Sequence, residues 1–130
     1  MAFYLDTSAA VKLVVAEAGS TALLRWLRTN ADEAVSSDLL RTELLRATRR
    51  AAPDQMVRAR TVLESLTLLK LTTDICERAA TLEPMMLRSL DALHIAAALE
   101  LGDELTALVT YDEHMTRGAS MLGIPVATPT

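Results

Sequence analysis

The chain has 130 residues, of which 51% are hydrophobic and only 3% aromatic, and its formal net charge is −4. A chain of this length forms one domain, residues 1–130, with an aliphatic core and roughly two thirds of its surface buried on folding. The acidic balance argues against a protein that coats nucleic acid non-specifically, and no apolar run approaches the roughly 20 residues that span a bilayer.

Short apolar segments alternate with longer amphipathic segments along the chain. In order, the sequence predicts a strand at 2–5, helices at 7–15 and 20–30, a strand at 34–36, helices at 37–51 and 53–65, a strand at 66–71, helices at 72–82 and 90–101, a strand at 107–110, a helix at 112–122 and a strand at 124–126. Strands that alternate with helices indicate a parallel sheet covered by helices on both faces. No repeat or linker divides the chain, so we expect one α/β domain.

Polar residues at the expected helix starts predict how those helices are capped. Ser20, Ser89 and either Thr72 or Thr73 precede or open a helical segment, and their side chains suit the N-cap position. Gly102 ends the segment 90–101, which is the most apolar helix of the chain.

The single cysteine and the N-terminal residues indicate the cell compartment. Cys76 cannot form an internal disulfide, and it falls at an apolar position of the helix 72–82, so we expect a buried, inert thiol. Met1–Asp6 carries no basic residue and reaches an acid too early for a signal peptide. These features predict a cytoplasmic protein without a membrane segment.

Four carboxylates stand where an apolar segment stops or a helix starts. Asp6 follows the first strand and Asp112 follows the strand 107–110, while Asp91 opens the apolar helix and Glu43 lies in the first turns of the helix from residue 37. In an open parallel sheet these positions converge on one crevice. Acids crowded there suit a hard divalent cation such as Mg²⁺ or Mn²⁺, which can activate water to hydrolyse a phosphodiester. Metal binding should then release protons and weaken at low pH.

Each acid also has a purely structural explanation. Asp6 and Asp112 can act as helix N-caps, and Asp91 gains about 0.3–1 kcal/mol from the helix dipole. Glu43 can pair with an arginine of its own helix on the solvent side. These separate explanations do not account for four acids at the same edge of the sheet.

Other residues near the acids carry weaker signals. His94 lies three residues after Asp91, where it can hydrogen-bond near the site or serve as a buried structural histidine. Glu113 and His114 follow Asp112 too closely for all three to face one metal, so we place both at the periphery. Trp26 lies on a leucine-rich helix, which favours the core or a dimer surface. The sequence has no zinc-ligand spacing, no Gly-rich phosphate loop and no Gly-x-Ser-x-Gly elbow.

The segment 41–60 is rich in arginine, with a local net charge of +4. Such a segment can contact a phosphate backbone or can simply be a solvated helix face. Its six arginines are Arg41, Arg46, Arg49, Arg50, Arg58 and Arg60.

With these motifs in order, the sequence resembles the PIN-domain ribonucleases, and within them the VapC toxins of type II toxin–antitoxin pairs. The matching segments cover essentially the whole chain. They are Tyr4–Ala9, Arg41–Leu44, Arg88–Ala98 (the most specific), Val109–Asp112 and Leu122–Val126.

The resemblance implies a three-layer α/β/α sandwich with a short, mostly parallel central sheet and Mg²⁺- or Mn²⁺-dependent endonuclease activity on RNA. It implies that Asp6 and Asp91 bind the metal directly, and that Glu43 and Asp112 complete the site directly or through metal-bound water. The small polar residues that match the family near these acids, and that would orient them, are Thr7, Ser8 and Thr110.

The resemblance also implies partners. It indicates a homodimer and a VapB-type antitoxin whose tail lies over the active site. Either RNA or this antitoxin would contact the arginines that lie closest to Glu43 in sequence, which are Arg41, Arg46, Arg49 and Arg50.

The interpretation we favour is a toxin-type ribonuclease that cleaves single-stranded or loop RNA, since unstacked loops are where proteins read RNA sequence. One alternative is a Mg²⁺-dependent small-molecule phosphohydrolase in which Asp6 forms a covalent aspartyl-phosphate. Another is a non-catalytic partner-binding module that keeps its acids only as helix caps.

Overall fold

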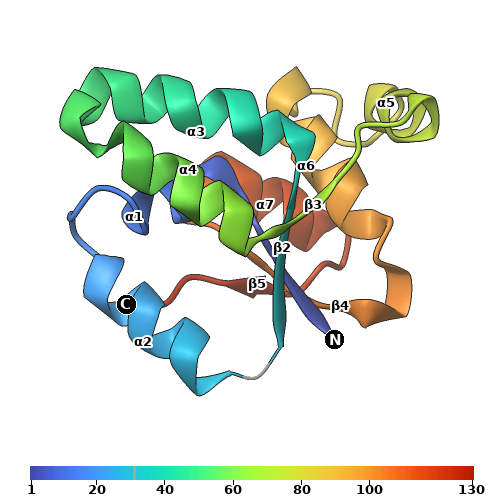
Figure 1. Ribbon diagram of the computed structural model, residues 1–130. Coiled ribbons are helices and arrows are strands. Elements are labelled where there is room, and N and C mark those ends of the chain that lie inside the picture. Colours follow the sequence, from blue (N-terminus) through green and yellow to red (C-terminus); the bar gives the residue numbers. More distant parts are fainter. Residues whose placement is uncertain (31) are drawn as a thin grey trace.

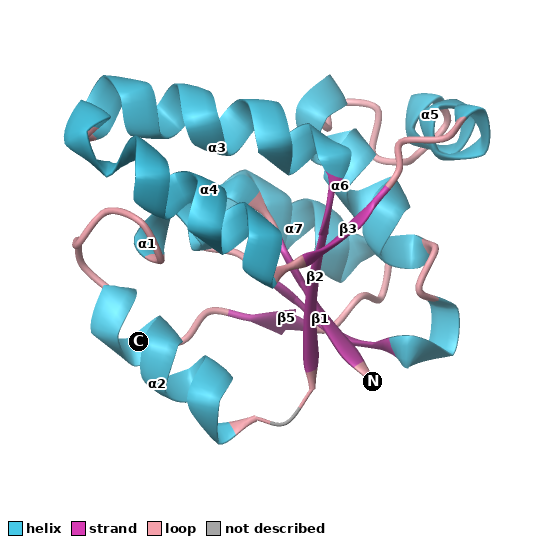
Figure 2. Cartoon of the chain, viewed as in Figure 1, coloured by secondary structure: helices cyan, strands magenta, loops and turns pink. Residues whose placement is uncertain are grey.

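A five-stranded sheet, parallel throughout, lies at the centre of the computed structural model, which describes residues 1–30 and 32–130 (Figures 1 and 2). The strand order is β3-β2-β1-β4-β5, so β1 pairs with β2 on one side and with β4 on the other. The strands are β1 (Ala2–Leu5), β2 (Glu33–Ser37), β3 (Thr67–Leu69), β4 (Leu105–Val109) and β5 (Val126–Ala127).

Helices cover both faces of the sheet (Figure 1). They are α1 (Thr7–Lys12), α2 (Ser20–Thr29), α3 (Asp38–Ala51), α4 (Met56–Ser65), α5 (Thr73–Ala80), α6 (Ser89–Leu99) and α7 (Glu113–Met121), with 3₁₀ turns at Pro53–Gln55 and Gly102–Glu104.

The central strand β1 shows why the layers form. Its side chains alternate between the two faces, as they must in a strand. Phe3 and Leu5 pack with α1, α2, α3 and α4, whereas Ala2 and Tyr4 pack with α5, α6 and α7. All four are buried, so β1 has no solvent-facing side. The expected three-layer α/β/α sandwich is confirmed, with a sheet that is parallel throughout.

The predicted elements agree with the observed ones in order and type, and differ mainly at their ends. β1 has the predicted bounds, and the helix predicted from residue 53 opens with the 3₁₀ turn Pro53–Gln55 before α4. Two strands differ more: β3 is confined to Thr67–Leu69, and the last strand lies at Val126–Ala127 rather than at 124–126. Both lie at the edges of the sheet, where a strand pairs on one side only.

Of the hydroxyl residues predicted as N-caps, only Thr72 is confirmed, because its side chain accepts a hydrogen bond from the Ile75 N–H. The residue before α2 is Gly19, whose positive φ of 90° suits glycine. Ser20 instead accepts from the Glu17 N–H and donates to the Val15 carbonyl, which fixes the preceding turn. Ser89 is already helical, and the residue before α6 is Arg88.

The prediction of a buried Cys76 is wrong, because the thiol is exposed on α5. Ile75 and Ala79 form the buried face of α5, and Cys76 lies next to that face rather than on it.

The core interpretation of Trp26 is confirmed. Its partly buried ring packs on Phe3, with 4.4 Å between the two ring centroids. Within residues 1–30 and 32–130, every helix is too short or too polar to cross a bilayer.

Candidate active site at the carboxyl edge of the sheet

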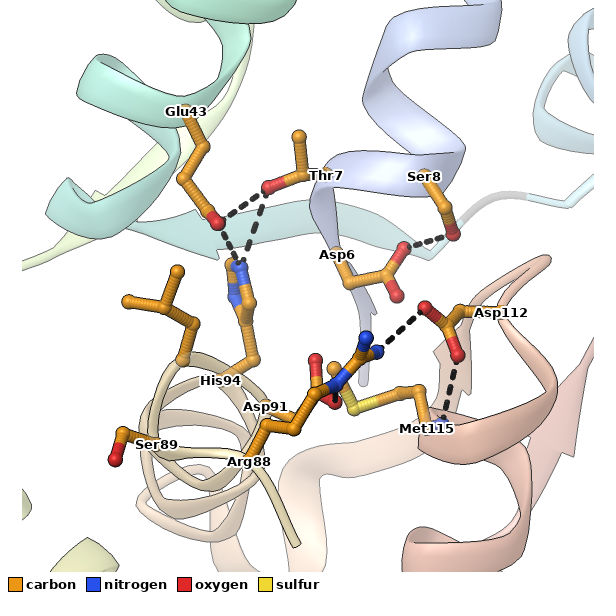
Figure 3. Close-up of a pocket in the computed structure, with 11 residues that line it drawn as sticks. Asp6, Thr7, Ser8, Glu43, Arg88, Ser89, Asp91, His94, Asp112 and Met115 are labelled. Carbon is orange, nitrogen blue, oxygen red and sulfur yellow. Dashed lines mark hydrogen bonds and ion pairs between the residues drawn. The ribbon is translucent and has the colours of Figure 1, made fainter.

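The four predicted acids line one cavity of about 340 Å³ at the carboxyl edge of the sheet (Figure 3). β2 and β3 lie on one side of β1, and β4 and β5 lie on the other, so the order of strands reverses between β1 and β4. Such a switch between neighbouring strands is where open α/β sheets bind ligands. Asp6 follows β1 and Asp112 lies three residues beyond β4, while Glu43 comes from α3 and Asp91 from the first turn of α6.

Asp6 is the most buried of the four, with 2% of its surface exposed. Its Oδ1 accepts hydrogen bonds from the Ala9 N–H at 3.0 Å and the Ser8 hydroxyl at 2.6 Å, and its Oδ2 accepts from the Thr110 hydroxyl. Burial raises the pKa of Asp6 above its usual range, although these hydrogen bonds partly offset the rise. Asp6 is therefore both the N-cap of α1 and a charged group with a high desolvation cost.

Asp112 also combines a cap with a position in the cavity. Its Oδ1 accepts from the N–H groups of His114 at 2.7 Å and Met115 at 3.2 Å, which caps α7, while Oδ2 faces Arg88. Burial opposes ionisation of Asp112, but the backbone hydrogen bonds and Arg88 outweigh it and lower its pKa. The capping explanation for the acids is thus correct for two of them without excluding a role in the cavity.

Glu43 lies at the end of a buried hydrogen-bond chain. Its Oε1 lies 2.6 Å from the Thr7 hydroxyl and 2.7 Å from His94 Nε2, and His94 Nδ1 lies 2.8 Å from the Tyr4 hydroxyl. Tyr4 donates its proton to Ser37, so the His94 Nδ1–H donates to Tyr4. His94 therefore joins the Glu43 carboxylate to the Tyr4 hydroxyl through its two ring nitrogens.

The same contacts determine the ionisation of Glu43 and Tyr4. Partial burial opposes the charge on Glu43, but hydrogen bonds from His94 and Thr7 outweigh it and lower the pKa of Glu43. Burial raises the pKa of Tyr4, so the phenol stays neutral and acts only as a hydrogen-bonding group. His94 is 2% exposed and lines the cavity, so it is a structural histidine that also contacts the site.

Arg88 is a cavity residue to which sequence reasoning gave no role. Its Nε donates to Asp91 Oδ2 at 2.8 Å, and its Nη2 donates to Asp112 Oδ2 at 3.0 Å. Figure 3 shows the guanidinium between these two acids. The available signal was its spacing, because an arginine three residues before an acid at a helix start can pair with it.

The three small polar residues each hydrogen-bond to an acid. Thr7 contacts Glu43, and both Ser8 and Thr110 contact Asp6. Thr110 also accepts from the Asp112 N–H at 3.1 Å, and its bond to Asp6 links the segments that follow β1 and β4. These contacts limit the rotation of the acids.

The arginines of α3 lie outside the cavity. Arg41 pairs with Asp38 at 2.8 Å. Glu113 and His114 are likewise exposed and absent from the cavity lining, in keeping with their predicted peripheral position. The exposed residues of α3 in this group are Arg41, Arg46, Arg49 and Arg50.

The donor set of the cavity is composed of carboxylate oxygens, which suits Mg²⁺ or Mn²⁺ better than zinc. In the described residues, no three His, Cys, Asp or Glu side chains lie together closely enough to bind a metal without rearrangement. Two of the acids instead face the Arg88 cation. The donors fit a hard cation in kind.

Comparison with known proteins identifies the family. The PIN domain family model matches residues 3–120. Ribonuclease VapC47 of Mycobacterium tuberculosis (strain CDC 1551 / Oshkosh) is 42% identical, with 97% of this chain and 96% of the relative covered. Ribonuclease VapC46 of Mycobacterium tuberculosis (strain ATCC 25618 / H37Rv) is 43% identical, with 98% of each chain covered.

Solved structures share the fold at lower sequence identity. The crystal structure of Mycobacterium tuberculosis VapC20 superposes with a TM-score of 0.79 at 17% identity, covering 98% of this chain and 99% of the other. A toxin–antitoxin complex from Klebsiella pneumoniae contains a chain with a TM-score of 0.74 at 24% identity, covering 98% of this chain and 97% of the other. The chain belongs to the PIN-domain family and, within it, to the VapC ribonucleases.

Proposed function

We propose that this VapC ribonuclease is the toxin of a type II toxin–antitoxin pair and hydrolyses phosphodiester bonds in single-stranded or loop RNA, with Mg²⁺ or Mn²⁺ bound by its four acids. The observation that supports it is that Asp6, Glu43, Asp91 and Asp112 all line one cavity at the switch point of the sheet. A bound divalent ion would supply charge neutralisation at the phosphate and a water of lowered pKa.

The protein's own residues prepare the acids for that role. Ser8 and Thr110 hold both oxygens of Asp6 by hydrogen bonds, so its carboxylate keeps one orientation. His94 and Thr7 hold Glu43 in the same way from the other side of the cavity. Orienting hydrogen bonds of this kind commonly change metal affinity or activity 10–100-fold.

The alternative of a covalent phosphohydrolase is disfavoured by the relatives of the chain, which are named ribonucleases. Loop RNA is also the substrate form named for VapC20, which is described as a sarcin–ricin loop cleaving toxin.

The proposal includes partners and location. A second copy of the chain would form a homodimer in the cytoplasm, and a VapB-type antitoxin would lay its tail over the cavity. The Klebsiella pneumoniae neighbour of this fold is a toxin–antitoxin complex. The exposed arginines of α3 would contact RNA or antitoxin outside the cavity; they are Arg41, Arg46, Arg49 and Arg50.

Asp91→Asn should reduce RNA cleavage with Mn²⁺ by at least about 100-fold, beyond the loss typical of a merely supporting residue. The measurement is the initial rate on a structured RNA with exposed loops. Asp74→Asn is the matched control, because Asp74 also lies in the first turn of a helix but is exposed and outside the cavity. Equal rates for the two variants would contradict the proposal.

A further inference from the structure

The strongest unassigned feature of the cavity is the position of Arg88. Among the described residues that line the cavity, Arg88 is the one arginine, and no lysine joins it. It donates two charged hydrogen bonds to acids from different elements, Asp91 of α6 and Asp112 before α7. The bond to Asp112 joins residues that lie 24 positions apart in the sequence.

The backbone of Arg88 is fixed while its side chain is free to move. The Arg88 carbonyl accepts from the Ala92 N–H at 2.8 Å in the first turn of α6. The preceding Leu87 packs closely over Gly118 of α7, where an added Cβ would lie 2.8 Å from Leu87 Cδ1. In contrast, 59% of the Arg88 side chain is exposed. The guanidinium can therefore change partners at the rim of the cavity without any change in the backbone.

We propose that Arg88 is a displaceable counterion: its guanidinium pairs with Asp91 and Asp112 in the metal-free protein, leaves them when a divalent cation binds, and then binds a phosphate of the RNA. This inference rests on the proposed function of the acids. Arg88 occupies two carboxylate oxygens that a metal would need, so the two cations compete. Once released, its planar guanidinium suits a phosphate, which it can bind through two parallel hydrogen bonds.

The first test is Mn²⁺ binding without RNA, measured by electron paramagnetic resonance of free Mn²⁺. Arg88→Gln removes the competing cation and keeps a hydrogen-bonding side chain, so Mn²⁺ affinity should rise roughly 3–10-fold, within the range of coupling between linked sites. Arg117→Gln is the matched control, because it removes an exposed arginine of the neighbouring helix that lies outside the cavity. Its Mn²⁺ affinity should change by less than about 2-fold, as expected for a screened surface charge.

The second test is RNA binding at saturating Mn²⁺, with an RNA in which a CH2 group replaces the bridging oxygen at each loop linkage, which keeps the charge and blocks hydrolysis. Arg88→Gln should weaken binding and reduce the slope of log affinity against log salt by roughly one contact, about 0.7 for a single strand. Arg88→Lys should keep most of this slope, since it keeps the charge. Its Mn²⁺ affinity should lie between those of the wild type and Arg88→Gln, because an ammonium lacks the rigid fork that joins two acids.

Three results would overturn the inference: unchanged or weaker Mn²⁺ binding by Arg88→Gln, an equal rise in Arg117→Gln, or an unchanged salt slope for RNA. A failure of the proposed function would be seen in a different measurement, because Asp91→Asn would then cleave RNA as fast as Asp74→Asn. Melting temperatures in EDTA verify that each variant is folded, which we expect because the replaced side chains are exposed.

Discussion

Asp6→Asn should raise the melting temperature of the metal-free protein while reducing RNA cleavage by about 1000-fold or more, the scale reported for loss of one group that stabilises a transition state. Both effects have the same source. Asp6 lies in a nearly closed site, where burial raises its pKa and makes its charge costly unless a cation is bound. The asparagine removes the charge and with it a ligand that the metal needs.

The sign of the pH dependence follows from the raised pKa of Asp6. The folded protein binds this proton more tightly than the unfolded chain, so stability falls as the pH rises from the unfolded pKa through the folded pKa. Above both values the loss is complete and constant, and each unit of difference is worth about 1.4 kcal/mol. The stability gain of Asp6→Asn should therefore vanish in acid and grow as the pH rises above the unfolded pKa of the aspartate.

Asparagine fits the hydrogen-bond network around Asp6. Its Oδ1 can keep the bonds from the Ala9 N–H and the Ser8 hydroxyl. Its Nδ2 would meet the Thr110 hydroxyl, which lies 3.3 Å from the Ser8 hydroxyl and can turn its proton there. Thr110 then accepts from the new amide, so no buried polar group loses its partner.

Thermal melts in EDTA and in excess Mn²⁺ test this prediction. A gain of about 1 kcal/mol corresponds to roughly 2–8 °C for domains near this size. In Mn²⁺ at 100 times its Kd, the wild type should gain about 2.7 kcal/mol and Asp6→Asn almost none, which reverses their order. Asp74→Asn should follow the wild type in both buffers. A lower melting temperature of Asp6→Asn in EDTA would contradict the assigned desolvation cost.

His94→Leu should lower the free energy of unfolding by about 2–4 kcal/mol, because two polar groups lose the hydrogen bonds that His94 makes with them. The substitution removes the partner of the Glu43 carboxylate, whose side chain is only 22% exposed. It also removes the proton that the Tyr4 hydroxyl accepts deep in the core. Urea denaturation in EDTA measures the change.

Matched variants separate the pair from general effects of the substitution. His114→Leu changes an exposed histidine and should alter the free energy of unfolding by less than about 0.5 kcal/mol. Adding Glu43→Leu to His94→Leu should recover part of the lost stability, because no unpaired carboxylate remains. If the two losses simply add, the Glu43–His94 pair does not exist in solution.

Sequence patterns predict most of this fold because the physical signals are local. β1 is four apolar residues ended by an acid, and its bounds are correct. Cys76 shows the limit, because hydrophobicity places a residue on a helix without saying which of two adjacent positions faces the core. Ser20 shows another, since a serine near a helix start can stabilise the preceding turn as well as the helix.

Sequence patterns likewise predict one part of the candidate site and miss another. The convergence of the four acids follows from the order of strands and helices, which the sequence patterns reveal. The bridge from Arg88 to Asp112 does not, because it depends on how the segment before α6 approaches the end of β4. The proton chain from Glu43 to Tyr4 is also a tertiary feature, since it joins α3, α6 and β1.

The order of strands has a consequence for the synthesis of a toxin. β1 is made first, but its second neighbour β4 spans Leu105–Val109 and brings Asp112, so the cavity closes only after β4 has been made. A nascent chain that has emerged as far as α6 carries three of the acids without the wall that β4 provides. Translation adds about 5–20 residues per second, so roughly 5–20 seconds separate the synthesis of Asp6 from that of Asp112. The active site therefore forms late in synthesis, after the segments that carry its other three acids.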